Sequence, residues 1–231
     1  MIRAAFFDLY NTLVRFEPPR HELQARACAE FGIHIETEAI RRSYWVADDF
    51  MSRENARFSI QQRSEEERRQ FWAEYEATLL RAAGAEVSTE LAGQVFTRIR
   101  HMDRRLVLFD DVLPTLGAVK SRGLVLGLLS NLDQSVEELC RELALDRYLD
   151  FCLVSLEVGV EKPHPPIFLT ALERAGVDAS EALHVGDQYH SDVVGARGVG
   201  ISPLLLDREN VLGHINDCPR ITSLAEVLDY I

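Results

Sequence analysis

The stretch Phe6-Phe7-Asp8-Leu9-Tyr10-Asn11-Thr12-Leu13 places a lone carboxylate at the end of a short apolar run. The residues before it are mostly apolar from Ile2 onward, which predicts a buried strand that ends in a loop at Asp8. Open parallel α/β sheets bind ligands at the carboxyl ends of their strands. Asp8 is therefore a candidate nucleophile, and an ordinary strand end with a turn aspartate is the alternative for this segment alone.

Three further polar clusters occur later in the chain in a fixed order, each beside an apolar run. They supply hydroxyl, amide, ammonium and carboxylate groups suited to an anionic substrate. The clusters are Ser130-Asn131, Lys162-Pro163 and Gly186-Asp187-Gln188-Tyr189-His190-Ser191-Asp192. Together with Asp8 and Thr12, this ordered set resembles the haloacid dehalogenase-like (HAD) hydrolase superfamily, and the resemblance covers nearly the whole chain.

The resemblance implies an α/β fold with a Rossmann-like parallel sheet core and an inserted all-helical cap domain of the C1 type. The residue patterns agree with it. From about Pro18 to Leu106 apolar residues recur at helical spacing, and after Pro114 strand-like and helical segments alternate. We therefore expect a hydrolase core at residues 1–16 and 107–231 and a helical cap at residues 17–106.

The expected elements follow from the same patterns. Apolar stripes predict four cap helices around residues 23–31, 40–51, 71–79 and 91–99. Apolar runs predict core strands near 2–8, 124–129, 152–155, 182–186 and 201–206. In the family these strands have the order 5-4-1-2-3, which would bring Asp187, Asp8 and Ser130 to one edge of the sheet.

The chemistry of the first and last clusters suits a metal-assisted attack. Asp8 offers an anionic oxygen that could attack phosphorus, or a carbon bearing a leaving group, to form a covalent intermediate that water hydrolyses. Asp187 and Asp192 could hold Mg²⁺ with Asp8 and the backbone carbonyl of Tyr10, because Mg²⁺ prefers a few hard oxygen ligands. A turn and a helix N-cap are the alternatives for the two later aspartates. Thr12 is expected to order the loop, with its hydroxyl bonded to the Asp8 carboxylate.

The two middle clusters supply groups for binding an anion. Ser130 and Asn131 can donate hydrogen bonds to a phosphoryl oxygen or a carboxylate, or cap the following helix. Lys162 and Lys120 are the only lysines in a chain whose other basic residues are arginines. A compact ammonium at position 162 is therefore a notable choice. The resemblance implies that this lysine screens the nucleophile and the intermediate from one another.

Tyr10 departs from the phosphatases of the superfamily, most of which carry a second aspartate two residues after the nucleophile. That aspartate protonates the leaving group, and a phenol with a pKa of about 10 replaces it poorly. Asp8-Leu9-Tyr10 resembles instead the first motif of the metal-independent 2-haloacid dehalogenases. Those enzymes lack the first carboxylate of the last motif, whereas this chain has Asp187. Its first motif is therefore dehalogenase-like and its last motif phosphatase-like.

Three hypotheses follow from this combination. The first is a Mg²⁺-dependent phosphatase that acts on a small phosphorylated metabolite. The second is a metal-independent 2-haloacid dehalogenase. The third is a catalytically weak relative that binds a ligand or partner.

Composition limits the partners. The chain has 231 residues, a formal charge of -12 and a pI near 5.1, which argues against nucleic acid or an anionic membrane as the main partner. No leader and no apolar run of membrane-spanning length is evident, so we expect a cytoplasmic monomer or homodimer acting on a small anionic substrate. The four cysteines show no metal or redox spacing and are expected to be reduced.

Overall fold

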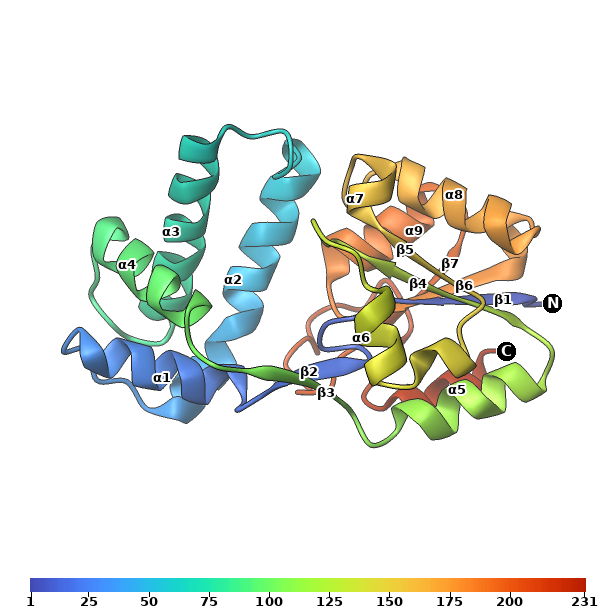
Figure 1. The fold of residues 1–231 in the computed structure, drawn as a ribbon, viewed down its shortest axis with the longest axis horizontal. Helices are drawn as coiled ribbons and strands as arrows, with labels where there is room; N and C mark the ends of the chain where they lie inside the picture. Colours follow the sequence, from blue (N-terminus) through green and yellow to red (C-terminus); the bar gives the residue numbers. More distant parts are fainter. The chain divides into compact units, whose positions relative to one another are not determined.

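The computed structural model describes residues 1–231 and divides the chain into two compact units (Figure 1). One unit contains residues 1–15 and 107–231, and the other contains residues 16–106. The chain passes between the units along strands β2 (Val14–Glu17) and β3 (Arg105–Leu108), which pair with each other as a separate two-stranded sheet. This short sheet was not predicted, because each strand has only four residues and lies beside a change of pattern.

The first unit is built on a six-stranded sheet whose hydrogen-bonded pairs are all parallel. The strand order is β5-β4-β1-β6-β7-β8, so the five predicted strands and their order are confirmed. Strand β8 is an additional pair of residues at the edge of the sheet. The strands are β1 (Ala4–Phe7), β4 (Val125–Ser130), β5 (Phe151–Val154), β6 (Ala182–Gly186), β7 (Ser202–Leu206) and β8 (Arg220–Ile221).

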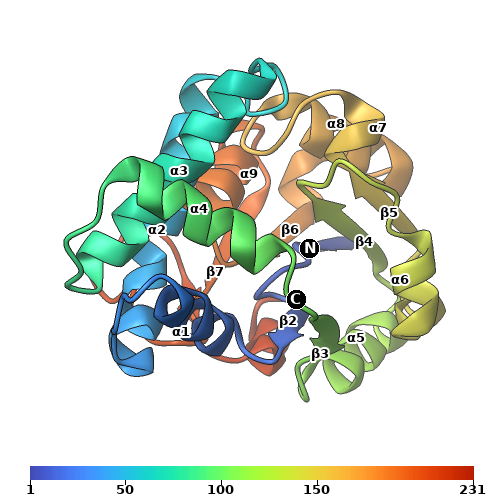
Figure 2. The same ribbon diagram turned by 60° about the vertical axis from the view of Figure 1, so that its left-hand side comes forward.

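Helices cover both faces of this sheet, as Figures 1 and 2 show for α8 and α5. Burial of apolar side chains drives the arrangement, since Phe6 and Leu129 from the sheet pack with Ile167 and Phe168 from α8. The helices are α5 (Val112–Ser121), α6 (Glu137–Glu142), α7 (Ser155–Val158), α8 (Pro165–Ala175) and α9 (Gly195–Gly198), with short helical turns η1 (Leu145–Arg147), η2 (Ala179–Glu181), η3 (Tyr189–Val194) and η4 (Leu224–Asp229). The predicted α/β fold class is confirmed.

The second unit is all-helical and contains the four predicted helices. Its core is formed by apolar residues at helical spacing, among them Leu23, Ala77, Leu80 and Val95. Ser64 caps α3 in a reciprocal capping box with Glu67, which explains where that helix begins. The helices are α1 (Arg20–Glu30), α2 (Thr37–Arg57), α3 (Glu65–Ala82) and α4 (Thr89–Arg100).

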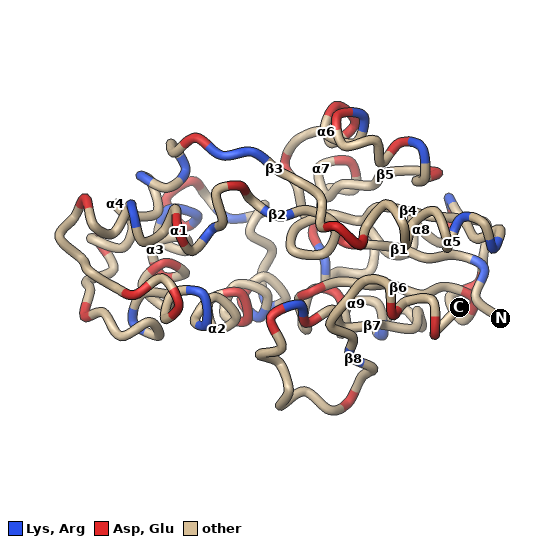
Figure 3. Tube along the Cα trace, turned by 90° about the horizontal axis from the view of Figure 1, so that it is seen from below, with Lys and Arg blue, Asp and Glu red and all other residues tan.

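Charged residues of both signs are interspersed along each unit, as Figure 3 shows. Many of them form ion pairs between exposed side chains, such as Arg41 with Glu38 and Arg98 with Glu30. Exposed pairs of this kind add little to stability. No helix of the structure has both the length and the apolar character that a membrane crossing requires.

Candidate active site

The carboxyl ends of three neighbouring strands bring the predicted residues together. Strand β1 lies between β4 and β6, with Phe7 paired to Leu128 on one side and Val185 on the other. Asp8 therefore emerges beside the end of β4, where Ser130 is buried, and beside the end of β6, which Asp187 follows. The Asp8 amide still donates to the Val185 carbonyl at 2.9 Å, so the sheet itself holds the backbone of Asp8.

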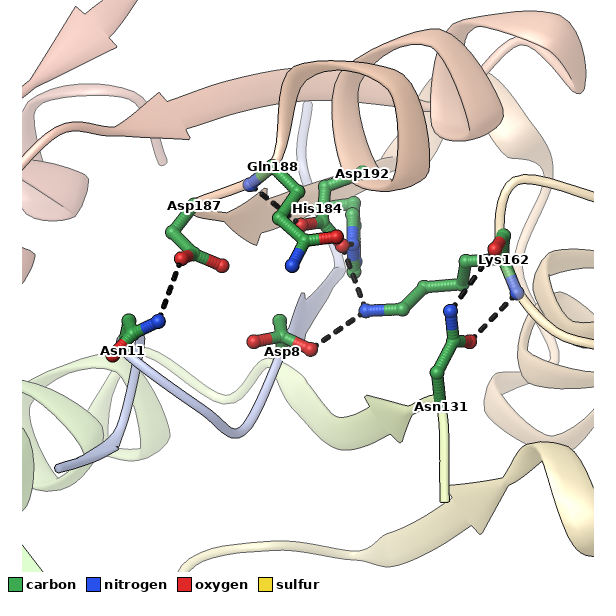
Figure 4. A network of polar contacts seen from close by, with 8 residues as sticks. All are labelled: Asp8, Asn11, Asn131, Lys162, His184, Asp187, Gln188 and Asp192. Atoms are coloured by element: carbon green, nitrogen blue, oxygen red, sulfur yellow. Dashed lines mark hydrogen bonds and ion pairs between the residues drawn. The ribbon is translucent and has the colours of Figure 1, made fainter. Parts of the chain in front are cut away.

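Lys162 lies between two carboxylates in the centre of this cluster (Figure 4). Its Nζ is 2.8 Å from Asp8 Oδ1 and 2.7 Å from Asp192 Oδ1. The lysine is only 2% exposed, and Asp192 is equally buried. A buried ammonium between two carboxylates is a costly arrangement that needs close pairing, which these contacts supply.

The charges in the cluster shift one another's pKa values. Burial raises the pKa of Asp8, and the nearby Lys162 charge offsets that effect only in part. Burial alone would lower the pKa of Lys162, but the charges of Asp192 and Asp8 outweigh it and the net pKa is raised. For Asp192, burial acts to raise the pKa, and the Lys162 charge with the His184 hydrogen bond lowers it overall. Lys162 and Asp192 are therefore a charged pair, and Asp8 is the more basic carboxylate.

Asn131 holds the backbone of the lysine segment. Its side-chain Oδ1 accepts from the Lys162 amide at 2.7 Å, and its Nδ2 donates to the Lys162 carbonyl at 3.0 Å. Both ends of the Asn131 amide are thus occupied, although the sequence suggested that Asn131 would bond to the substrate. Ser130 is the last residue of β4, the strand whose Leu128 pairs with Phe7 directly before Asp8.

Asp187 lies on the opposite side of Asp8 from the lysine. In Figure 4 the carboxylates of Asp8 and Asp187 face one another. Asp187 Oδ2 accepts from Asn11 Nδ2 at 3.1 Å. Asn11 has a φ of 57°, a left-handed conformation that asparagine adopts more readily than most residues. The first-motif loop is thereby tied to the last motif.

The oxygen atoms on the Asp187 side of Asp8 are suitable ligands for a Mg²⁺ ion that keeps some of its water molecules. Asp8 and Asp187 offer two carboxylates, and the backbone carbonyl of Tyr10, two residues after Asp8 in the chain, is a further candidate oxygen ligand. Asp192 is different, because Oδ1 contacts Lys162 and His184 while Oδ2 accepts from the Gln188 amide at 3.0 Å. No three His, Cys, Asp or Glu side chains gather as a metal-binding group. Two carboxylates are hard oxygen ligands of the kind that Mg²⁺ prefers, and they could hold the ion together with water molecules.

Thr12 is placed behind the nucleophile loop but not as the sequence suggested. Its hydroxyl oxygen is buried and has no hydrogen-bond partner, so the expected bond to Asp8 is absent. Its carbonyl instead accepts from Arg208 Nη2 at 2.8 Å. Arg208 also contacts the Asp111 carboxylate, with both distances at 3.0 Å. The loop is therefore anchored through its backbone.

Sequence reasoning missed two residues of this network, His184 and Arg208. The signal for His184 is a single polar residue inside the apolar run Ala182 to Val185. Arg208 follows the apolar strand β7, and nothing local connects it to Thr12, which lies 196 positions earlier.

Comparison with known proteins agrees with this architecture. A family model described as haloacid dehalogenase-like hydrolase matches residues 2–200. A mouse protein named haloacid dehalogenase-like hydrolase domain-containing protein 3 is 30% identical over 89% of this chain and 82% of its own length. A glyceraldehyde 3-phosphate phosphatase from Methanopyrus kandleri is 28% identical over 90% of this chain and 85% of its own length.

The chain also resembles a solved structure of a dehalogenase. The 2-haloacid dehalogenase from Pseudomonas syringae superposes with a TM-score of 0.58 and 25% identity, covering 99% of this chain and 97% of that chain. Relatives of both activities therefore share this fold.

Proposed function

Since this chain belongs to the haloacid dehalogenase-like hydrolases, we propose that it is a Mg²⁺-dependent phosphatase that acts on a small phosphorylated metabolite through Asp8. The observation that carries the proposal is the Asp187 carboxylate facing Asp8 across the end of the sheet. A second anionic group that faces the nucleophile would repel an anionic substrate unless a cation lay between them. The relative named glyceraldehyde 3-phosphate phosphatase also supports phosphatase activity.

Asp8 performs the covalent step. One carboxylate oxygen attacks phosphorus, the bond from phosphorus to the leaving oxygen breaks, and water then hydrolyses the aspartyl phosphate to phosphate. Lys162 lies 2.8 Å from Oδ1 of Asp8, where its charge opposes repulsion between carboxylate and phosphate. Ser130, the last residue of the neighbouring strand β4, would donate a hydrogen bond to a phosphoryl oxygen.

The cation would be held by Asp8, Asp187 and the Tyr10 carbonyl, with Asp192 serving mainly as the counter-ion of Lys162. When bound, it neutralises charge on the transferring phosphoryl group. The prediction that Asp192 itself binds the metal remains a prediction, and its two occupied oxygens favour the counter-ion role.

Tyr10 limits the leaving groups that the site can expel. A phenol two residues after the nucleophile is a poorer general acid near neutral pH than the carboxylic acid of most related phosphatases, because its ordinary pKa is about 10. Substrates whose leaving group needs little protonation are therefore favoured. The helical unit, residues 16–106, is proposed to act as the cap whose side chains select the substrate.

Hydrolysis of p-nitrophenyl phosphate, with Mg²⁺ and with excess chelator, tests the proposal. We expect turnover that requires Mg²⁺ and is lost in Asp8→Asn and Asp187→Asn. Asp146→Asn is the matched control, because Asp146 is an exposed aspartate in η1 of the same unit. Full metal-dependent turnover by Asp187→Asn would overturn the proposed metal site, and full turnover by Asp8→Asn would overturn the nucleophile.

A 2-haloacid dehalogenase is the second candidate, favoured by Asp8-Leu9-Tyr10 and by the solved dehalogenase. Halide is a good leaving group and needs no acid, so Tyr10 would then be no handicap. This candidate predicts that chelator leaves halide release from 2-chloropropionate intact and that Asp8→Asn stops it. Absence of halide release alongside Mg²⁺-dependent phosphate release would eliminate it.

A further inference from the structure

His184 is a buried polar residue in the middle of the otherwise apolar strand β6. It is 1% exposed and pairs in parallel register with Phe6 of β1, so it lies in the sheet beside the nucleophile strand. One face of its environment is apolar, since the Phe168 ring packs edge-on against it with 5.3 Å between centroids. A histidine in such a place needs a specific partner.

That partner is Asp192. His184 Nε2 lies 2.9 Å from Asp192 Oδ1, the same oxygen that Lys162 Nζ contacts at 2.7 Å. A carboxylate oxygen only accepts, so Nε2 carries the hydrogen and donates. The other ring nitrogen, Nδ1, is buried without a hydrogen-bond partner. Burial also lowers the pKa of His184, which agrees with a neutral ring that donates through Nε2.

The contacts of Asp192 show what this hydrogen bond controls. Oδ2 accepts from the Gln188 amide at 3.0 Å, and Oδ1 is shared by His184 and Lys162. The carboxylate also lies tightly against the backbone of Gly186, where a Cβ would approach Asp192 Cγ to 2.1 Å. With these contacts in place the carboxylate has one orientation, and that orientation presents Oδ1 to the lysine.

We propose that His184 is a positioning residue for the reaction at Asp8. It acts through Asp192, whose fixed Oδ1 draws the Lys162 ammonium to the point where it also reaches Asp8 (Figure 4). A neutral donor is suited to this task because it orients the carboxylate without adding a second cation that would compete with the lysine. The inference rests on the proposed function only in taking Asp8 as the reacting group.

Two substitutions of His184 distinguish the effect of its hydrogen bond from the effect of its packing. His184→Leu introduces an apolar side chain of similar size and removes the donor, whereas His184→Gln keeps a side-chain N–H donor at a comparable reach. We expect His184→Leu to lower kcat by about 10-fold to 100-fold with little change in KM, as loss of outer-shell partners does elsewhere. His184→Gln should restore kcat to within about threefold of the wild type.

Phe168→Leu is the matched control, because Phe168 touches the same imidazole ring and has no polar group that could orient the Asp192 carboxylate. It should leave kcat within about threefold of wild type. The inference is overturned if His184→Leu retains wild-type kcat, or if His184→Gln and His184→Leu lose it equally. Equal losses would mean that only the shape of the ring matters.

A readout without turnover keeps this test separate from the proposed function. Long-range nitrogen–proton correlation spectra of the wild-type protein identify which ring nitrogen of a histidine carries the proton, and the spectrum of His184→Gln assigns the signal. We expect the neutral Nε2–H form for His184. A protonated Nδ1 with bare Nε2 would refute the positioning role even in an active enzyme. If the wild type releases halide but no phosphate, the proposed function fails, and the same three variants then test His184 on halide release.

Discussion

At the scale of single residues, the central feature is the sharing of one ammonium by two buried carboxylates. Lys162 contacts both Asp8 and Asp192, and neither Lys162 nor Asp192 has appreciable exposure. Removal of one member of such a group leaves uncompensated charge in a poorly solvated place. Stability and catalysis should therefore both depend on this lysine.

The two lysines of the chain provide a matched test of that statement. Lys162→Met should reduce kcat at least about a hundredfold, because the charge opposing repulsion at Asp8 is lost. It should also lower the free energy of unfolding by about 3 kcal/mol at neutral pH. Lys120→Met removes an ion pair with Asp150 that is more than a third exposed on both sides, so its cost should stay below about 1 kcal/mol. Equal losses in the free energy of unfolding for the two variants, measured by urea unfolding, would contradict this expectation.

Tyr10 makes a second prediction at this scale. Tyr10→Asp introduces an acid where most phosphatases of the superfamily have one, so it should raise kcat on alkyl phosphates more than on p-nitrophenyl phosphate. The ratio of the two rates in each protein is the measurement. If the wild-type protein has no phosphatase activity and the Tyr10→Asp variant is active, the result would instead support the hypothesis of a catalytically weak relative.

Asp8, Lys162 and Asp187 could be selected as candidates from the sequence, because residue type and position beside an apolar run are local signals. The sequence could not show that both polar atoms of the Asn131 side-chain amide would be hydrogen-bonded to the backbone of Lys162, 31 positions away. Nor could it show that the Thr12 hydroxyl would remain without a partner. Those outcomes depend on how distant segments pack, which a local pattern does not contain.

At the scale of elements, the turn from β6 into η3 determines where the last motif lies. The π-helical turn η3 begins at Tyr189 and carries Asp192 back against Gly186 at the end of β6. The sequence predicted a strand, a loop and the start of a helix here, but π-helical turns are rare and have no reliable sequence signature. Close approach of Asp192 to the backbone explains why position 186 is a glycine.

Gly186→Ala tests this packing. The added Cβ would lie 2.1 Å from Asp192 Cγ, so the carboxylate must move and Lys162 loses its fixed partner. We expect a fall in kcat of at least about tenfold, read from p-nitrophenyl phosphate turnover. Gly198→Ala is the control, because a Cβ there meets nothing within 4 Å in α9, and it should retain full activity. Wild-type kcat in Gly186→Ala would show that Asp192 does not need its present position.

The longer elements were predictable because they bury continuous apolar faces. Four helices of the second unit and five core strands follow from periodicity and apolar runs. Strands β2, β3 and β8 were missed, since short pairings depend on contacts between distant segments rather than on a local pattern.

At the scale of the whole molecule, the helical unit has a polar group in its core that couples stability to pH. Glu76 is 1% exposed, with Gln24 hydrogen-bonded to its carboxylate. Burial raises its pKa to about 7, which the Gln24 bond offsets only in part, from an ordinary value of 4.5. The folded unit therefore retains a proton that the unfolded chain releases between these two values.

The sign of the pH effect follows from that proton. Because the native state binds more protons between pH 4.5 and about pH 7, stability should fall as pH rises through this window. The loss should be on the order of 3 kcal/mol at most and complete above about pH 7. Glu76→Gln keeps the shape without an ionisable group, so its stability should change much less with pH.

Urea unfolding followed by tryptophan fluorescence measures this effect, since Trp45 and Trp72, the only tryptophans, both lie in the helical unit. Glu66→Gln is the control, because Glu66 is an exposed residue of the same helix α3. A wild-type unit whose stability stays level or rises between pH 5 and pH 8 would contradict the assignment.

The central claim is that Asp8 attacks phosphorus. The most direct test is rapid acid quench of the enzyme with a phosphoryl-labelled substrate in Mg²⁺, followed by peptide mapping of the label. We expect an acid-stable, base-labile acyl phosphate on the peptide that carries Asp8, and no such label in Asp8→Asn. Turnover of the substrate with label on another residue, or with continued full activity of Asp8→Asn, would contradict it.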